Sequence, residues 1–208
     1  MRMRVIAAFV ASLFCLCAQD ALGRQDGDGA GNFDYYVLSL SWSPTFCGRH
    51  RSNPQCSTPR GFVEHGLWPQ YEAGGYPQSC GTATPVPDPV IRKMLPLMPT
   101  RDLITHEWAK HGTCSGMSAN DYFAMAATAY RNVNVPAPLR TPSRLDASAD
   151  TVRSMFVGAN PGLPAAGVAV VCKGGEVSEV RLCLSKDLSY RACGRDVTDQ
   201  CGGTRVRR

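Results

Sequence analysis

Three features are scarce in this sequence of 208 residues: long apolar stretches, cysteines that lie close together, and histidines of any spacing. Residues 5–18 form an apolar run that is short for a bilayer, and no other stretch is apolar for long enough to cross one. No C-x-x-C pair occurs, which disfavours a structural zinc site. Internal repeats and low-complexity segments are also lacking, so the length favours one domain, or at most two small ones.

Residues 1–23 have the features of a signal peptide. Two arginines precede the apolar run at residues 5–18, and a small-residue cleavage signal, ALG, ends at residue 23. We therefore expect a folded domain over residues 24–208 and export to the periplasm or the cell exterior. An uncleaved membrane anchor is the alternative, and the short apolar run disfavours it.

The mature chain has only a mild positive charge. Loss of residues 1–23 removes two arginines and one aspartate, which leaves 20 basic and 16 acidic residues and a net charge of +4. Part of the excess lies in the tail at residues 205–208 (RVRR). Such a charge permits a polyanionic partner but does not identify one.

Eight of the ten cysteines follow the signal peptide, and an even number in an exported chain is typical of disulfide bonds. They are Cys47, Cys56, Cys80, Cys114, Cys172, Cys183, Cys193 and Cys201. We expect four disulfides, although the count alone does not choose among the many possible pairings.

Hydrophobic periodicity predicts strands at residues 34–42, 62–67, 168–172 and 177–184. It predicts helices at residues 89–95, 103–111, 118–130 and 150–157. Pro69 is expected to end the second strand, Gly112 to stop the second helix, and Ser118 to open the third helix with a capping box. Residues 43–60 are expected to be a loop closed by a local disulfide, and residues 71–90 an irregular segment. Helices interspersed among strands favour a single α+β domain with a central antiparallel sheet flanked by helices.

Three of the four histidines fall in two short motifs, HGLWP at residues 65–69 and HEWAKHG at residues 106–112. If the second motif is helical, its two histidines, Glu107 and Lys110 share an arc of about 140° around the helix axis. Each of these residues taken singly could be structural. Two imidazoles, a carboxylate and an ammonium on one helix face together indicate a functional site.

A metal site is the alternative for this motif. The zinc-protease helix places its histidines four residues apart, whereas His106 and His111 are five apart and would not converge on one ion. Lys110 among the ligands would also repel a cation. The spacing therefore disfavours a metalloprotease.

Histidines and a lysine without a metal suit the cleavage of RNA through its own 2′-hydroxyl. That reaction needs a base for the hydroxyl proton, an acid for the departing 5′-oxygen, and positive charge beside the phosphorane. Histidine can serve as either acid or base because its unperturbed pKa is about 6.5. DNA lacks the 2′-hydroxyl and would stay intact.

The two motifs resemble the active-site segments of the ribonuclease T2 family, in order and in separation. The resemblance extends from residues 34–42 (DYYVLSLSW) to the last cysteines, and the exported, eight-cysteine chain is similar to bacterial members. It implies a metal-independent endoribonuclease that needs no cofactor. We separately expect a monomer, with no membrane association after signal cleavage. Single-stranded RNA would be cleaved to 2′,3′-cyclic phosphates and then to 3′-phosphates.

The resemblance also implies a role for each motif residue. His65 would be the general acid for the 5′-oxygen, and His111 the general base for the 2′-hydroxyl. His106 would help to bind the scissile phosphate. Glu107 and Lys110 would stabilise the transition state.

Trp68, Gln70 and Tyr76 would line the base-binding site, although Trp68 could instead be a core tryptophan. Gln70 stands where fungal members carry an acidic residue, which argues against an adenine preference, so we expect broad base specificity. His50 is interpreted as a surface bystander. The other two tryptophans are interpreted as core residues.

The resemblance implies the disulfides Cys47–Cys56, Cys80–Cys114, Cys172–Cys201 and Cys183–Cys193. The second of these would tie the loop after the first motif to the end of the catalytic helix, and so hold His65 against His111. Two other hypotheses are a non-catalytic RNA-binding protein on the same scaffold and a disulfide-rich metallohydrolase. Loss of a motif histidine would mark the first, and both motifs are intact; loss of activity in EDTA would mark the second.

Overall fold

The computed structural model describes residues 29–142, 145 and 147–201. The expected signal peptide and the basic tail at residues 205–208 lie outside the described residues. The start of the mature domain at residue 24 therefore stays a prediction.

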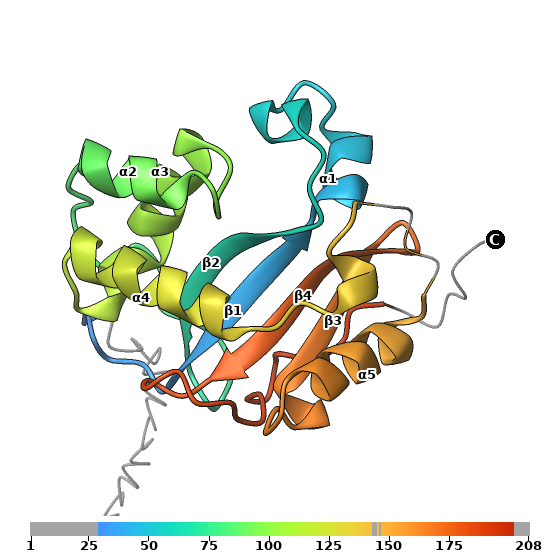
Figure 1. The fold of residues 1–208 in the computed structure, drawn as a ribbon. Coiled ribbons are helices and arrows are strands. Elements are labelled where there is room, and N and C mark those ends of the chain that lie inside the picture. Colours follow the sequence, from blue (N-terminus) through green and yellow to red (C-terminus); the bar gives the residue numbers. More distant parts are fainter. Residues whose placement is uncertain (1–28, 143–144, 146, 202–208) are drawn as a thin grey trace, which may run out of the picture.

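A four-stranded antiparallel sheet forms the centre of the molecule (Figure 1). Its strands are β1 (Tyr35–Trp42), β2 (Phe62–Gln70), β3 (Val168–Lys173) and β4 (Glu176–Leu184), in the order β2-β1-β4-β3. All four predicted strands are present. The expected single α+β domain with a central antiparallel sheet is confirmed.

Pro69 does not end β2, because the strand continues to Gln70 and pairs Pro69 with Tyr36. Proline has no N–H to give to a neighbouring strand. In this sheet, however, β2 is an edge strand with β1 on one side only, and proline is tolerated there. The predicted end at residue 67 is therefore wrong.

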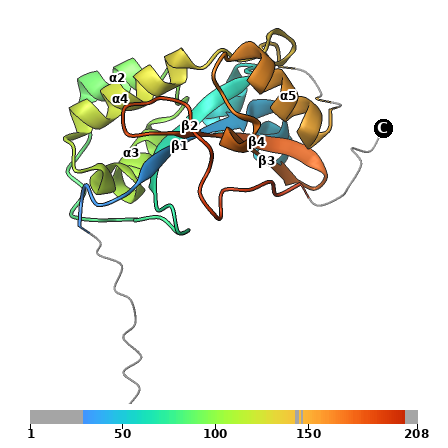
Figure 2. The same ribbon diagram turned by 90° about the horizontal axis from the view of Figure 1, so that it is seen from below.

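In the described part of the chain, five α-helices accompany the sheet. They are α1 (Ser43–Arg49), α2 (Asp88–Met94), α3 (Arg101–Lys110), α4 (Ala119–Asn132) and α5 (Ala149–Ala159). Helices α2, α3 and α4 gather on the β2 side of the sheet, whereas α5 packs beside β3 (Figures 1 and 2). The four predicted helices are all present, within a few residues of their expected ends.

The helix starts follow local capping chemistry. The Ser118 hydroxyl accepts the N–H of Asp121 at 3.2 Å and donates to its carboxylate at 2.7 Å, so Ser118 opens α4 as an N-cap as predicted. Thr100 opens α3 in the same way, accepting the N–H of Leu103 at 3.1 Å. Gly112 is not a left-handed helix stop: it begins a 3-10 turn, and its lack of a side chain is needed because a Cβ would lie 2.3 Å from Cε3 of Trp108.

Residues 43–60 are not the loop that their prolines suggest. They contain α1 and the 3-10 turn Pro54–Ser57, which the disulfide Cys47–Cys56 joins. Pro44 lies in the first turn of α1, where its missing N–H breaks no helical hydrogen bond. The Thr45 hydroxyl donates to the carbonyl of Val177 at 2.7 Å and so fastens α1 to β4.

Alternation along β1 gives the sheet two different faces. Tyr36, Leu38, Leu40 and Trp42 point into the main hydrophobic core beneath the helices. The residues between them, such as Val37, point to the opposite face, which carries a smaller cluster. The two tryptophans outside the HGLWP motif are buried as expected.

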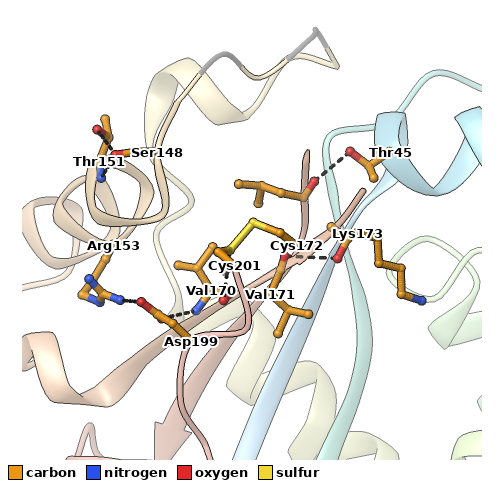
Figure 3. The surroundings of a disulfide bond; sticks show 12 residues. Thr45, Ser148, Thr151, Arg153, Val170, Val171, Cys172, Lys173, Asp199 and Cys201 are labelled. Carbon is orange, nitrogen blue, oxygen red and sulfur yellow. Dashed lines mark hydrogen bonds and ion pairs between the residues drawn. A yellow bond between two sulfur atoms is a disulfide. The ribbon is translucent and has the colours of Figure 1, made fainter. Parts of the chain in front are cut away.

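The four disulfides have the pairing that the family resemblance implies: Cys47–Cys56, Cys80–Cys114, Cys172–Cys201 and Cys183–Cys193. Figure 3 shows Cys172–Cys201, which fastens the C-terminal segment to β3. Beside it, Asp199 accepts the N–H of Val170 at 2.9 Å and pairs with Arg153 of α5. Within the described ranges, no helix is both long and apolar enough to span a membrane.

Candidate active site

His65 lies at a β-bulge in the middle of β2. Ser39 of β1 pairs with Gly66, and Leu40 pairs with Glu64, so His65 is an extra residue opposite no partner. Residues three apart on a regular strand point to opposite faces, but an inserted residue shifts the alternation by one. The bulge therefore places His65 and Trp68, three residues apart, on the same face of the sheet.

This shared face gathers the side chains of the HGLWP motif. The rings of His65 and Trp68 are nearly perpendicular, with centroids 5.1 Å apart. Gln70, two residues beyond Trp68, is buried at the end of β2. Alternation puts Gln70 on the same face as Trp68.

Glu107 reaches this face from α3. Its side chain is 1% exposed, and Oε2 accepts a hydrogen bond from Nε1 of Trp68 at 2.7 Å. Oε1 lies 3.6 Å from Nε2 of His65. Gly66 makes this approach possible, because a Cβ at that position would lie 2.2 Å from Glu107 Oε2.

His111 lies just beyond the helix that was predicted to include it. Helix α3 ends at Lys110, and His111 caps its C-terminus, so the expected stripe of four residues is not wholly helical. The change of direction stacks the His111 ring on Trp68, with centroids 5.1 Å apart and planes 25° apart. Its ring centroid is also 5.6 Å from that of Tyr76, and Nζ of Lys110 lies 5.7 Å from the Tyr76 centroid.

His106 lies near His65. It is exposed on α3 and lines, with His65, a cavity of about 400 Å³. Phe46 and His50, whose rings stack 4.6 Å apart, also line this cavity. His50 is exposed, as expected, but it borders the same cavity as two motif histidines and is not remote from the site.

The predicted site residues thus form one continuous region. His65, Trp68, Glu107 and His111 make up its centre, which we call the histidine cluster. Lys110 and the 41%-exposed Tyr76 lie on the His111 side, and His106 lies on the His65 side. Over the described residues, no group of three histidine, cysteine or acidic side chains is placed to hold a metal ion.

The comparison with known sequences identifies the family. A sequence model of the ribonuclease T2 family matches residues 33–193. The chain belongs to the ribonuclease T2 family. A ribonuclease of Aeromonas hydrophila is 48% identical over 99 residues, which span 47% of this chain and 45% of that protein. Ribonuclease DdI of Dictyostelium discoideum is 28% identical over 213 residues, 92% of each chain.

Solved structures show that the T2 fold is shared. Ribonuclease MC1 from the seeds of bitter gourd matches with a TM-score of 0.65 at 24% identity, over 82% of this chain and 97% of that one. An RNase-related protein from Calystegia sepium matches with a TM-score of 0.64 at 23% identity, over 80% and 93% of the two chains. These likenesses establish the fold, and the family match places the chain among RNA-cleaving enzymes.

Within this T2 site, the surroundings of His65 favour the protonated ring. Burial acts to lower the pKa of His65, but the hydrogen bond to Glu179 and the charges of Glu107 and Glu179 outweigh it. The pKa of His65 is therefore raised above its ordinary value. The neighbouring carboxylates therefore favour the protonated imidazole.

The surroundings of His111 have the opposite effect. Burial first, and then the positive charges of Lys110 and the two other motif histidines, lower the pKa of His111 to about 3. Its Nδ1 is buried and makes no hydrogen bond within the described chain. Burial and Lys110 also lower the pKa of His106. The ring of His111 is therefore neutral at neutral pH.

Two further residues contact the cluster and were missed by the sequence analysis. Oε2 of Glu179 lies 3.4 Å from Nδ1 of His65, and Nε of Arg181 donates to Oε1 of Glu179 at 2.5 Å. Their sequence signal is two charges at period two on a strand whose other face, Val180 and Leu182, is apolar. The sequence does not show which strand lies beside β4, so it could not place these charges near His65.

Proposed function

We propose that this protein is a metal-independent endoribonuclease that cleaves single-stranded RNA by transphosphorylation. The first products would be 2′,3′-cyclic phosphates, and their hydrolysis would give 3′-phosphates. The observation that carries the proposal is the pair His65 and His111: both contact Trp68, and their pKa values are shifted in opposite directions. One site thus holds a proton donor and a proton acceptor at the same pH.

The two histidines fit the two proton transfers of the first step. Neutral His111 takes the proton of the 2′-hydroxyl, and the 2′-oxygen attacks phosphorus. As the bond from phosphorus to the 5′-oxygen breaks, protonated His65 gives its proton to that oxygen. In the second step the roles reverse: His65 takes a proton from water, and His111 returns one to the 2′-oxygen, which restores both starting states.

The other motif residues surround the phosphate that such a reaction requires. Lys110 and His106 supply positive charge or hydrogen-bond donors on opposite sides of the histidine cluster. Glu107 accepts a hydrogen bond of 2.7 Å from Trp68 with one oxygen and lies 3.6 Å from His65 with the other. These two contacts fix the position of the Glu107 carboxylate. We assign phosphate binding to His106 and transition-state stabilisation to Glu107 and Lys110.

The two sides of the cluster fit two different nucleosides. Tyr76 and Trp68 offer aromatic rings on the His111 side, where the base attached to the attacking ribose would stack; Gln70 would complete that site. The cavity of about 400 Å³ adjoins His65, the acid, and so would receive the departing nucleoside. Stacking accepts every base, which supports broad specificity.

Export and a monomeric state complete the proposal. Four disulfides favour an oxidising compartment, which fits a secreted or periplasmic enzyme. A monomer fits a site whose proposed residues all come from one chain.

The test is cleavage of single-stranded RNA by the oxidised chain from residue 24, in excess EDTA. We expect cyclic-phosphate products, detectable by mass spectrometry, and their loss in both His65→Ala and His111→Ala. An RNA with a 2′-O-methyl group at each cleavage site is the matched substrate control and should stay intact. RNA binding without cleavage would favour the non-catalytic hypothesis, and activity that requires added zinc would overturn the acid–base mechanism.

A further inference from the structure

Strand β4 presents two charged side chains to the face of the sheet that carries His65. Glu179 is 13% exposed and Arg181 is 21% exposed, so both are largely withdrawn from water. Charged groups in this position cost free energy unless they are paired. Their pairing with one another, at 2.5 Å, offsets part of that cost. It does not explain why both side chains point to the face that carries His65.

The register of the sheet explains how Glu179 reaches His65 across an intervening strand. Glu179 pairs with Ser41 of β1, and Arg181 pairs with Ser39. On their other side these serines pair with Val63 and Gly66 of β2, the residues around the His65 bulge. Serine is short, so β1 leaves space above it, and the longer side chains of β4 extend over that space to the imidazole.

The contacts of His65 divide between its two ring nitrogens. Nδ1 faces Glu179 Oε2 at 3.4 Å, and Nε2 faces the Glu107 side of the cluster, where Glu107 Oε1 lies at 3.6 Å. A carboxylate that accepts a hydrogen bond from one imidazole nitrogen fixes the ring orientation and leaves the other nitrogen to transfer protons. Arg181 in turn fixes the carboxylate.

We propose that Glu179 is the positioning residue of the general acid: held by Arg181, it orients His65 through Nδ1, keeps it protonated, and directs Nε2 to the departing 5′-oxygen. This inference rests on the proposed function, in which His65 is the acid. In this proposal Glu179 lines the cavity beside His65 and acts on the reaction through His65, without contacting the phosphate.

The charges around His65 support this division of labour. From α3, Glu107 and His106 face the imidazole, and from β4, Glu179 and Arg181 face it. The carboxylates outweigh both the cations and burial, because the pKa of His65 is raised. Burial would raise the pKa of Glu179, but His65 and Arg181 together lower it to about 2. Glu179 is therefore an anion over the whole range in which His65 titrates.

The experiment compares Glu179→Gln with the wild type on two substrates that differ only in how much the leaving group needs an acid. One is a dinucleoside phosphate, whose 5′-oxygen must be protonated. The other is a nucleoside 3′-(4-nitrophenyl phosphate), whose nitrophenolate leaves without a proton. We expect kcat to fall by about 10–100-fold on the first and to change little on the second, with KM nearly unchanged on both.

Two additional measurements separate this role from a structural one. The pKa of His65, followed by NMR of the labelled imidazole, should fall in Glu179→Gln, and the alkaline limb of the kcat profile should move to lower pH by the same amount. Glu179→Leu, which removes the acceptor as well as the charge, should show a larger loss on the dinucleoside phosphate. Glu176→Gln, at an exposed position of the same strand, is the matched control and should behave as wild type.

Equal losses on the two substrates, or an unchanged His65 pKa in a folded Glu179→Gln protein, would overturn the inference. The proposed function would survive either result, because it depends on wild-type cleavage and on the loss of that cleavage in His65→Ala. A wild-type protein that cleaves neither substrate would instead reject the proposed function, and this inference with it.

Discussion

His65 and His111 are identical side chains in one site, and the protein surrounds them in opposite ways. His65 extends from a sheet, with a carboxylate near each ring nitrogen. His111 follows a helix end, is 3% exposed, and has Trp68 against its ring and Lys110 beside it in the chain. Burial acts on both imidazoles in the same direction, so the neighbouring charges decide the difference. The sheet favours the acid form, and the helix end favours the base form.

The largest expected effect comes from removing each histidine in turn. On a dinucleoside phosphate, His65→Ala and His111→Ala should each lower kcat/KM by about 10²–10⁴-fold. On a nucleoside 3′-(4-nitrophenyl phosphate), His65→Ala should recover most of its activity because no acid is needed, whereas His111→Ala should not. Steady-state kinetics on both esters measures the contrast, and recovery in the His111 variant would show that the two roles are exchanged.

Gly66→Ala should have the next largest effect. It should lower the stability of the protein and disturb the surroundings of His65, the proposed acid. The new Cβ would lie 2.2 Å from Glu107 Oε2 and 2.6 Å from Trp68 Nε1, and so would break their hydrogen bond. Overpacking of this kind costs about 1–3 kcal/mol of unfolding free energy. Gly158→Ala is the matched control: it lies in α5 with open space around it and should stabilise by about 0.5–1 kcal/mol. Urea denaturation checks both, and equal values would contradict the steric argument.

Lys110→Met tests the surroundings of His111, the proposed base, and should have a smaller effect on activity. Loss of this cation removes one cause of the low pKa of His111, so that pKa should rise. In the proposed mechanism activity needs neutral His111 and appears as pH rises through its pKa, so the acid limb of the pH–rate profile should move to higher pH. We also expect kcat/KM to fall by about 10-fold at neutral pH through lost phosphate stabilisation. Lys93→Met, exposed on α2, serves as the control, and an unmoved acid limb would remove Lys110 from this role.

Glu64→Gln should have the smallest effect on activity and a distinct effect on stability. Glu64 precedes His65 but faces the core, where burial and the charge of Glu107 raise its pKa to about 8. A raised carboxyl pKa makes the folded state bind more protons than the unfolded state, so wild-type stability falls as pH rises from about 4.5 to about 8. The Gln variant lacks this slope and should gain stability relative to wild type over that range. Thermal unfolding at several pH values measures it, and parallel curves would show that Glu64 titrates normally.

Local patterns predicted much of this fold because they act within one element. The period-two run around Val37 and the N-cap at Ser118 both appear in the structure where expected. The HGLWP and HEWAKHG motifs contain the residues that lie together in the candidate active site. Helix α1 escaped prediction because its one proline, Pro44, lies at the helix start, a position that composition does not distinguish from a loop.

What the sequence could not supply depends on pairing between distant segments. The bulge at His65 is defined by its partner strand, and Glu179 reaches the imidazole only because β1 lies between β4 and β2. The position of His111 as a cap depends on how α3 packs, because Gly112 must fit against Trp108. These features arise from tertiary structure, and a single sequence contains no direct signal for them.

The bulge in β2 has a consequence for how this site tolerates changes in length. Phe62–Glu64 and Gly66–Gln70 pair with β1 in two registers that differ by one residue. The one residue between them is His65, so its deletion would restore regular pairing and remove the proposed acid itself. Inserting one residue between His65 and Trp68 would instead shift the alternation and turn Trp68 to the opposite face of the sheet. The spacing of the motif is therefore as restrictive as its composition, and a gain or loss of one position should abolish activity in a protein that still folds.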